Sequence, residues 1–215
     1  MKPIIVINFK TYPQATGAKA EELARMCEAV AKRHDVDIRV AVQAADIYRV
    51  CHAVSIPVYT EHVDPIDPGR HTGYILPEDV KAEGAVGTLL NHSEHRVKPE
   101  VIARTVLHAK AAGLKVIICA ATPKEGAEYA RLKPEFVAVE PPELIGGKVS
   151  VSTAKPEVIT KAVAMIKAPL LVGAGVHTGE DVKIALKLGA QGVLLASGVT
   201  KAKDPKRALE ALLKF

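Results

Sequence analysis

The sequence has no tryptophan, three phenylalanines and five tyrosines, so aromatic side chains are scarce. Proteins that hold single-stranded nucleic acid stack the bases on aromatic rings, and the lysines and arginines here form no polybasic run. We therefore expect no nucleic-acid partner. The apolar stretches are short: residues 116–121 and 192–196 fall far below the roughly 18 residues that cross a bilayer, so we expect no membrane segment.

Cysteine is also rare, because Cys27, Cys51 and Cys119 are widely spaced and form no C-x-x-C pair. Such a set argues against a disulfide framework and against a thiolate metal site. Residues 1–7 lack the long apolar core and the cleavage site of a signal peptide, so we expect a cytoplasmic protein. The excess of 29 basic over 24 acidic residues suits an anionic ligand.

Short β-branched runs alternate with amphipathic stretches along all 215 residues. This alternation is typical of βα units that build a parallel sheet. The expected strands are residues 4–8, 38–42, 57–60, 86–91, 115–119, 136–139, 170–172 and 192–195. The expected helices are residues 16–34, 45–52, 77–83, 98–112, 123–132, 155–166, 178–188 and 204–213.

Eight such units predict an α/β protein with the (β/α)₈ TIM barrel, as a single domain over residues 1–215. The competing topology is a doubly wound open sheet. Its dinucleotide-binding forms carry G-x-G-x-x-G after the first strand, where this chain has Asn8-Phe9-Lys10. A closed barrel is therefore favoured. The polar residues that follow its strands meet at one mouth, so they are the first candidates for function.

Two of these side chains suit proton transfer. Glu140 follows the apolar strand 136–139 and precedes two prolines, and burial in the mouth would raise its pKa and make it a usable base. His92 follows strand 86–91, where a neutral imidazole could polarise a carbonyl. Each residue could instead be structural, as a surface glutamate or a histidine bonded to the loop backbone. His92 and His95 lack a nearby acid to complete a ligand set, so we expect no metal site.

Asn8 and Lys10 have the same parity at the end of the first strand, so both side chains can face the mouth. An ammonium there calls for an anion, unless Lys10 extends to the rim. Glu94 could pair with Lys10 and hold it in place. After the last two strands, Gly175 and Ala196-Ser197 could present backbone N–H groups to a phosphate, although small residues are also common in ordinary turns.

The segment after Glu140 begins with two prolines, carries the apolar pair Leu144-Ile145 and continues into Gly146-Gly147. A rigid start, an apolar tip and a flexible end are typical of a lid that excludes water. The alternative is an ordinary long loop.

These motifs together resemble one enzyme family, triosephosphate isomerase, in the compact form found in archaea. The resemblance covers the whole chain in the same order. It rests on Asn8-Phe9-Lys10, Asn91-His92-Ser93-Glu94, Val139-Glu140-Pro141 with Ile145-Gly146, Gly175 and Ala196-Ser197. It implies the interconversion of dihydroxyacetone phosphate and D-glyceraldehyde 3-phosphate through an enediolate, in glycolysis and gluconeogenesis, with no cofactor.

The resemblance also implies residue roles. Glu140 would be the base, His92 the electrophile, and Lys10, assisted by Asn8, the electrostatic anchor. Glu94 would support Lys10. The implied contacts to substrate and phosphate are Asn8, Phe9, Lys10, Ile145, Gly146, Gly175, Ala196 and Ser197.

The chain departs from the family pattern at several positions. Gly147-Lys148 follows Gly146 where most relatives have Thr-Gly, and Gly175 stands where longer relatives have Ser. Glu61 stands where Gln is common. The loop from Thr60 to Ile75 resembles the loop that crosses between subunits in the family, so the resemblance implies a homodimer or homotetramer. The same loop could be an ordinary intrachain connection.

Two other functions stay open. One is a phosphate-binding barrel that senses or scaffolds without turnover, and the other is a different phosphosugar enzyme such as an aldolase or synthase. A Schiff-base aldolase needs a desolvated lysine in mid-strand, and none of the expected strands has one inside. Replacement of Glu140 separates an isomerase from a binding protein, because only the isomerase has turnover to lose.

Overall fold

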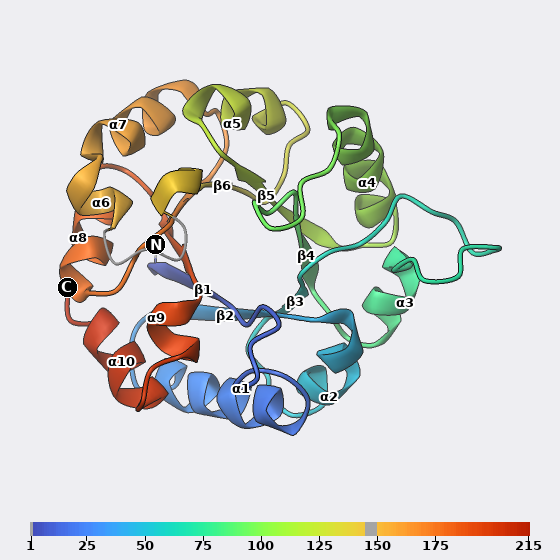
Figure 1. Ribbon diagram of the computed structural model, residues 1–215, viewed down its shortest axis with the longest axis horizontal. Helices are drawn as coiled ribbons and strands as arrows, with labels where there is room; N and C mark the ends of the chain where they lie inside the picture. The colour runs from blue at the N-terminus through green and yellow to red at the C-terminus, as the bar shows by residue number, and fades with distance from the viewer. Residues whose placement is uncertain (1, 145–149) are drawn as a thin grey trace.

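The computed structural model describes residues 2–144 and 150–215, and it is a closed barrel of eight parallel strands (Figure 1). The strands follow one another in sequence order around the barrel, and β1 pairs with β8 to close it. This confirms the expected (β/α)₈ architecture. The strands are β1 Ile4–Asn8, β2 Asp37–Val42, β3 Val58–Thr60, β4 Gly87–Leu90, β5 Lys115–Ala120, β6 Phe136–Val139, β7 Leu170–Gly173 and β8 Gly192–Leu195.

Helices form a ring outside the strands (Figure 1). They are α1 Ala18–Ala31, α2 Ile47–Cys51, α3 Pro77–Ala82, α4 Pro99–Ala111, α5 Pro123–Ala130, α6 Val151–Ala154, α7 Pro156–Met165, α8 Gly179–Lys187, α9 Ser197–Thr200 and α10 Pro205–Leu212, with the 3-10 turns Ala44–Asp46 and Pro142–Leu144. Five helices begin with proline, which lacks the N–H that a first turn cannot pair. Within residues 2–144 and 150–215, no helix combines the length and apolar character needed to cross a membrane.

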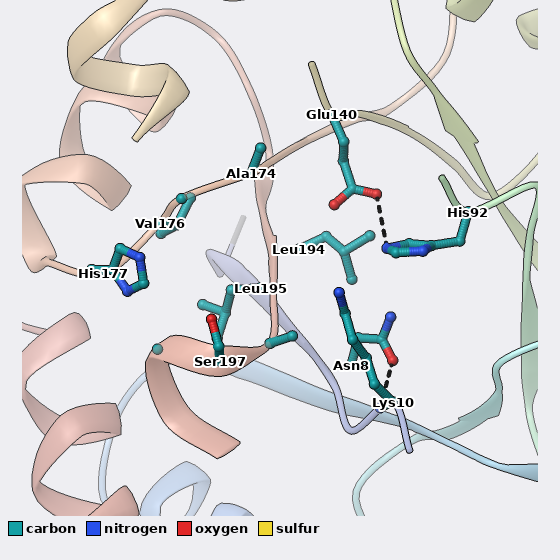
Figure 2. Close-up of a pocket in the computed structure, with 13 residues that line it drawn as sticks. Asn8, Lys10, His92, Glu140, Ala174, Val176, His177, Leu194, Leu195 and Ser197 are labelled. Atoms are coloured by element: carbon teal, nitrogen blue, oxygen red, sulfur yellow. Dashed lines mark hydrogen bonds and ion pairs between the residues drawn. The ribbon is translucent and has the colours of Figure 1, made fainter. Parts of the chain in front are cut away.

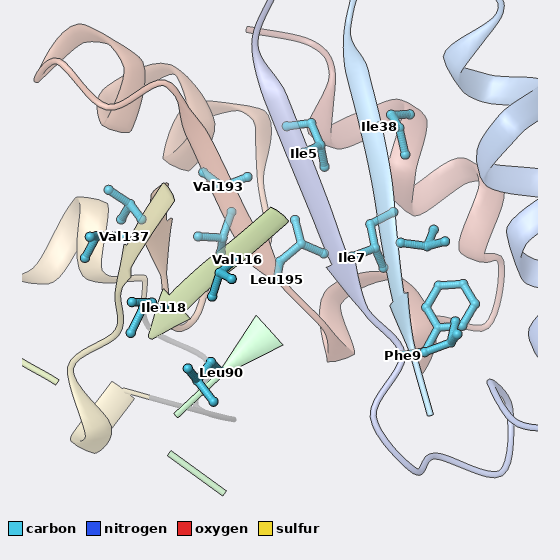
Figure 3. Close-up of a cluster of buried hydrophobic side chains, with 14 of the residues drawn as sticks. Ile5, Ile7, Phe9, Ile38, Leu90, Val116, Ile118, Val137, Val193 and Leu195 are labelled. Atoms are coloured by element: carbon cyan, nitrogen blue, oxygen red, sulfur yellow. The ribbon is translucent and has the colours of Figure 1, made fainter. Parts of the chain in front are cut away.

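Each strand contributes to two apolar layers, because alternate side chains point inward and outward. The outer layer lies between the strands and the helices and includes Ile5, Ile7, Phe9, Leu90, Val116 and Val193 (Figure 3). The inner layer fills the barrel and includes Ile4, Val6, Leu89, Ala138, Leu171 and Leu194. Burial on both faces explains why the strands are nearly continuous apolar runs.

A buried polar network lies at the N-terminal ends of the strands. Arg39 donates hydrogen bonds to Asp37, to the Tyr59 hydroxyl at 2.8 Å and to Glu135 at 2.9 Å. The Tyr59 hydroxyl donates to the other oxygen of Glu135 at 2.5 Å. The guanidinium carbon lies 5.2 Å from the centre of the Phe136 ring. Because each charge in the network has a partner, it fills this end of the barrel without an orphaned ion.

Candidate active site

Glu140 lies at the mouth of the barrel, directly after β6. Phe136 and Ala138 belong to the inner layer, and Glu140 continues their alternation, so its side chain also points inward. The side chain is 8% exposed, and burial raises the pKa of the carboxyl despite the opposing influence of His92 and Lys10. Among the residues the structure describes, its Oε2 has no hydrogen-bond partner. A buried carboxylate with raised proton affinity suits a general base.

The imidazole of His92 faces Glu140 across the cavity (Figure 2). Its Nε2 lies 3.7 Å from Glu140 Oε2, and its Nδ1 accepts a hydrogen bond from the backbone N–H of Glu94 at 3.2 Å. A nitrogen that accepts a hydrogen bond carries no proton, so the neutral ring holds its proton on Nε2. The ring therefore presents an N–H donor to the space beside Glu140.

Asn91 turns the chain so that His92 reaches this position. Its φ of 61° is left-handed, a conformation that asparagine tolerates better than most residues. Its amide nitrogen donates to the carbonyl of Cys119 at 3.0 Å, and its Oδ1 accepts the N–H of Val97 at 3.1 Å. Sequence reasoning missed this supporting role. The available signal was an asparagine directly after a strand, where a change of direction is needed.

Lys10 and Asn8 enter the same cavity from the end of β1 (Figure 2). The Lys10 ammonium lies 2.7 Å from Glu94 Oε1, which is the ion pair expected from the sequence. The backbone N–H of Lys10 donates to Asn8 Oδ1 at 3.0 Å, and this bond holds Lys10 at a left-handed φ of 51°. The lysine side chain is 10% exposed and extends into the cavity (Figure 2), where an anion would meet its charge.

The loops after β7 and β8 form the far wall of the cavity. Gly175, Ala196 and Ser197 line it, as the sequence predicts. Ala174 and Gly175 have left-handed φ values of 75° and 66°, which turn this loop sharply after the strand. The first N–H groups of a helix have no acceptor within it, so those at the start of α9, from Ser197, are not used by the helix itself. Small residues and backbone donors together suit a phosphate.

Three of the expected contacts, Phe9, Ile145 and Gly146, are not among the residues that line the cavity in the described part of the chain. Phe9 does not line the cavity, and its expected contact with substrate is wrong for its side chain, which is fully buried in the outer layer (Figure 3). The reason is parity: Phe9 follows the inward-facing Asn8 and so points outward. Ile145 and Gly146 lie outside the described residues.

The cavity has further lining residues that the sequence did not single out. Leu194 from the inner layer lies between Glu140 and Lys10 in Figure 2, and Val176 and His177 line the wall formed by the loops after β7 and β8. The backbone N–H of His177 donates to the Asp181 carboxylate at 3.1 Å. Leu194 reaches the cavity because β8 pairs with β7, and this pairing of distant segments is invisible in a local pattern.

A second cavity of about 580 Å³ adjoins the first and shares Lys10 and His92 with it. Its lining includes Tyr12, Gln43, Glu61, His62, Ile75 and His95. The rings of His62 and His95 are in contact, with their centres 4.3 Å apart and their planes tilted by 37°. Burial raises the pKa of Glu61 to about 7. Across residues 2–144 and 150–215, no three His, Cys, Asp or Glu side chains form a cluster that could hold a metal ion.

Comparisons with known proteins agree with this geometry. The family model for triosephosphate isomerase matches residues 3–214. Triosephosphate isomerase of Methanobacterium bryantii is 49% identical over 212 residues, which are 96% of this chain and 94% of the relative. The enzyme of Saccharolobus solfataricus is 48% identical over 212 residues, 97% of this chain and 93% of the relative.

The fold has a solved counterpart at lower identity. The crystal structure of triosephosphate isomerase from Bartonella henselae aligns with a TM-score of 0.74 at 20% identity, over 100% of both chains. At that identity the likeness speaks for the fold alone. The family model and the archaeal relatives, which align over nearly the full length, lead to one conclusion: the chain belongs to the triosephosphate isomerase family.

Proposed function

We propose that this chain interconverts dihydroxyacetone phosphate and D-glyceraldehyde 3-phosphate by moving a proton through an enediolate. The observation that carries the proposal is the pairing of a buried carboxylate with an imidazole. Glu140 Oε2 and His92 Nε2 are 3.7 Å apart in a cavity that also holds Lys10. Membership of the triosephosphate isomerase family supports the same reaction and its place in glycolysis and gluconeogenesis.

Glu140 acts as the base. Its carboxylate takes a proton from C1 of dihydroxyacetone phosphate, and the C–H electron pair forms the C1–C2 double bond while the carbonyl oxygen on C2 becomes negative. The proton of the C1 hydroxyl then passes to the C2 oxygen. Protonated Glu140 returns its proton to C2, and C1 becomes the aldehyde. The overall change moves hydrogen within one molecule, so no electrons enter or leave.

His92 and Lys10 stabilise the charge that develops on the oxygens. The Nε2–H of His92 donates to the oxygen that becomes negative, because Nδ1 is occupied by the N–H of Glu94. The Lys10 ammonium adds a fixed positive charge, and Asn8 holds the backbone that carries it. These groups interact more strongly with the enediolate than with the neutral carbonyl, and this difference lowers the barrier.

The phosphate binds at the opposite wall. Backbone N–H groups at Gly175, Ala196 and Ser197 hold it, and the family resemblance adds Ile145 and Gly146 from the segment after Glu140. A dianion held away from the reacting carbons orients C1 and C2 between the base and the imidazole.

Replacement of Glu140 with glutamine tests the assignment of the base. The expected result is a fall in kcat of at least about 10²-fold in a coupled isomerase assay, because glutamine cannot accept the proton. Exchange of the substrate α-proton with D₂O, followed by NMR, should slow in parallel. The matched control is Glu100→Gln, which makes the same change at an exposed position in the first turn of α4 and should leave both rates unchanged.

The outcome separates the proposed isomerase from its alternatives. Equal kcat in Glu140→Gln and the parent would remove the carboxylate from the mechanism. A parent that binds a phosphate ligand but neither isomerises triose phosphate nor exchanges its α-proton would instead be a binding protein. A parent that cleaves or joins carbon chains would be another phosphosugar enzyme.

We further propose that the chain forms a homodimer or homotetramer, in which the loop from Thr60 to Ile75 makes a contact between subunits. Residues 67–74 in this loop are all exposed, and the loop projects from the barrel between β3 and α3 (Figure 1). The second cavity, next to Lys10 and Glu61, offers a place for the loop tip of another copy. In sedimentation velocity, Thr72→Asp should produce monomers, whereas Thr160→Asp on the exposed face of α7 should not.

Each sedimentation result has a definite meaning. A monomeric parent would overturn the proposed association. If the parent is a tetramer that Thr72→Asp reduces to dimers, the loop forms only one of the two kinds of subunit interface. A parent whose size is unaffected by Thr72→Asp would show that the loop is an intrachain connection.

The proposed reaction needs no cofactor or metal, and the protein is expected in the cytoplasm. Dialysis against a chelator should leave kcat unchanged, because proton transfer here uses only side chains and backbone groups. Loss of activity on chelation, with recovery on addition of a divalent cation, would contradict this. Cell fractionation tests the location.

A further inference from the structure

Gly173 lies directly beside the proposed base in the barrel wall. The register of β6 and β7 pairs Ala138 with Leu171 and Val139 with Val172. Continuing this register by one residue sets Glu140 opposite Gly173. Both positions have the inward parity of Ala138 and Leu171, which belong to the inner layer.

The side chain of Glu140 occupies the space that a side chain at position 173 would fill. A Cβ on Gly173 would lie 2.4 Å from Cγ, 2.6 Å from Oε1 and 2.8 Å from Cδ of Glu140. Carbon atoms in contact are normally about 3.5–4.0 Å apart. A methyl group at position 173 and the carboxylate in its present position therefore exclude each other.

The backbone at Gly173 does not itself require glycine. Its φ is not positive, unlike those of Ala174 at 75° and Gly175 at 66°, and it pairs with Leu194 in the regular ladder of β8. Glycine weakens a strand relative to alanine, because glycine loses more backbone conformational entropy on folding and has no side chain to pack. The feature that favours glycine at this position is the close approach of Glu140.

We propose that Gly173 is a positioning residue. Because it has no side chain, the Glu140 side chain can occupy the space beside it, and this places the carboxylate next to His92. This rests on the proposed function, in which Glu140 is the base. A cavity of about 340 Å³ lies on the other side of Glu140, lined by Ser93, Arg96, Cys119, Ala120, Ala121 and Pro142. It gives a displaced carboxylate room to move, so a methyl group at position 173 would turn the base away instead of preventing folding.

The first test is the kinetics of Gly173→Ala. A base displaced by about 1 Å should lower kcat by about 10²-fold. The affinity for glycerol 3-phosphate, which has the phosphate but no carbonyl to enolise, should stay within about threefold of the parent, since the phosphate loops are untouched. The control is Val172→Ala, which trims an outward-facing core residue of the same strand. It should lower the free energy of unfolding and leave kcat unchanged.

A double-mutant cycle with Glu140→Ala separates displacement of Glu140 from general damage to the strand. Alanine has no Cγ, Cδ or carboxylate oxygens, so it removes every Glu140 atom that the new methyl group would meet. Gly173→Ala should therefore cost less than about fivefold in the residual kcat when Glu140→Ala is already present, against about 10²-fold in the parent. The same loss in both backgrounds would overturn the proposal.

The remaining outcomes are also decisive. In a crystal structure of Gly173→Ala, Glu140 Oε2 should lie well beyond 3.7 Å from His92 Nε2. A carboxylate that has not moved would refute the positioning role of Gly173, whatever the activity. If Gly173→Ala fails to fold, addition of Glu140→Ala should restore folding, and failure to do so would count against the proposal. An inactive parent would refute the proposed function. An active parent with a fully active Gly173→Ala variant would refute only the positioning role of Gly173.

Discussion

Replacement of Glu61 with glutamine should stabilise the fold by an amount that grows with pH. Glu61 follows β3 and lines the second cavity, where its Oε1 is buried without a hydrogen-bond partner in the part of the chain that the structure describes. Burial is the main reason that the pKa of its carboxyl is raised from 4.5 to about 7, and the nearby carboxylate of Glu94 adds to it. An interaction with the backbone of Lys10 opposes the rise.

The sign of the effect follows from proton linkage. A carboxyl whose pKa is higher in the folded chain than in the unfolded chain binds its proton more tightly when folded. The contribution of that proton to the free energy of unfolding is fully present below the pKa of the carboxyl in the unfolded chain. It is lost as the pH rises through the pKa of the carboxyl in the folded chain. At about 1.4 kcal/mol per unit, the shift from 4.5 to about 7 corresponds to about 3 kcal/mol above neutral pH. Glutamine stays neutral and avoids this loss.

The assay is urea unfolding at about pH 5 and about pH 8.5, at one protein concentration because association adds to apparent stability. Glu61→Gln should exceed the parent by about 3 kcal/mol at the higher pH and by much less at the lower pH. Glu22→Gln, on the exposed face of α1, should change stability little at either pH. An equal gain at both pH values, or none at the higher one, would refute the reasoning.

Three further outcomes follow from the structure. Arg39→Met removes the guanidinium from the half-buried Glu135, which keeps Lys115 and the Tyr59 hydroxyl as partners, so the free energy of unfolding in urea should fall by about 2–3 kcal/mol. A loss below about 1 kcal/mol would contradict the network. Thr178→Ala removes the hydroxyl that caps α8 by accepting the N–H of Asp181, and it should lower the free energy of unfolding by about 1 kcal/mol in the same assay. An unchanged free energy of unfolding would show that the cap does not contribute to stability. Because burial raises the pKa of Glu140, kcat/KM should fall with decreasing pH through a midpoint above 4.5, and a midpoint at or below 4.5 would argue against a buried base.

The barrel could be predicted because strands buried on both faces must be nearly continuous apolar runs. Strands β6 and β8 have the expected bounds, Phe136–Val139 and Gly192–Leu195. Helix ends were less accurate: a helix over residues 16–34 was expected, and α1 covers Ala18–Ala31. Gly17 adopts a left-handed φ of 61° before α1, so the helix cannot begin earlier. Apolar spacing alone does not carry such backbone information.

The candidate site could be predicted as far as its residues follow strands. The sequence predicts that Glu140 and His92 meet at one mouth, because parallel strands bring their C-terminal ends together, and the two side chains lie 3.7 Å apart. The expectation for Phe9 failed because parity along β1 sends its side chain outward. The relation of Gly173 to Glu140 could not be predicted from the sequence, because it depends on the register between β6 and β7. That register is a property of the assembled sheet.

The two ends of the barrel should respond differently to substitution. Arg39 and Glu135 belong to the network at the N-terminal ends of the strands, whereas Gly173 and Glu140 lie where strands end. Substitutions at sites that share no partner usually add in free energy. Arg39→Met combined with Gly173→Ala should therefore show the full stability loss of the first and the full kcat loss of the second. A kcat for the pair well below that of Gly173→Ala alone would mean that the strands transmit strain from one end of the barrel to the other.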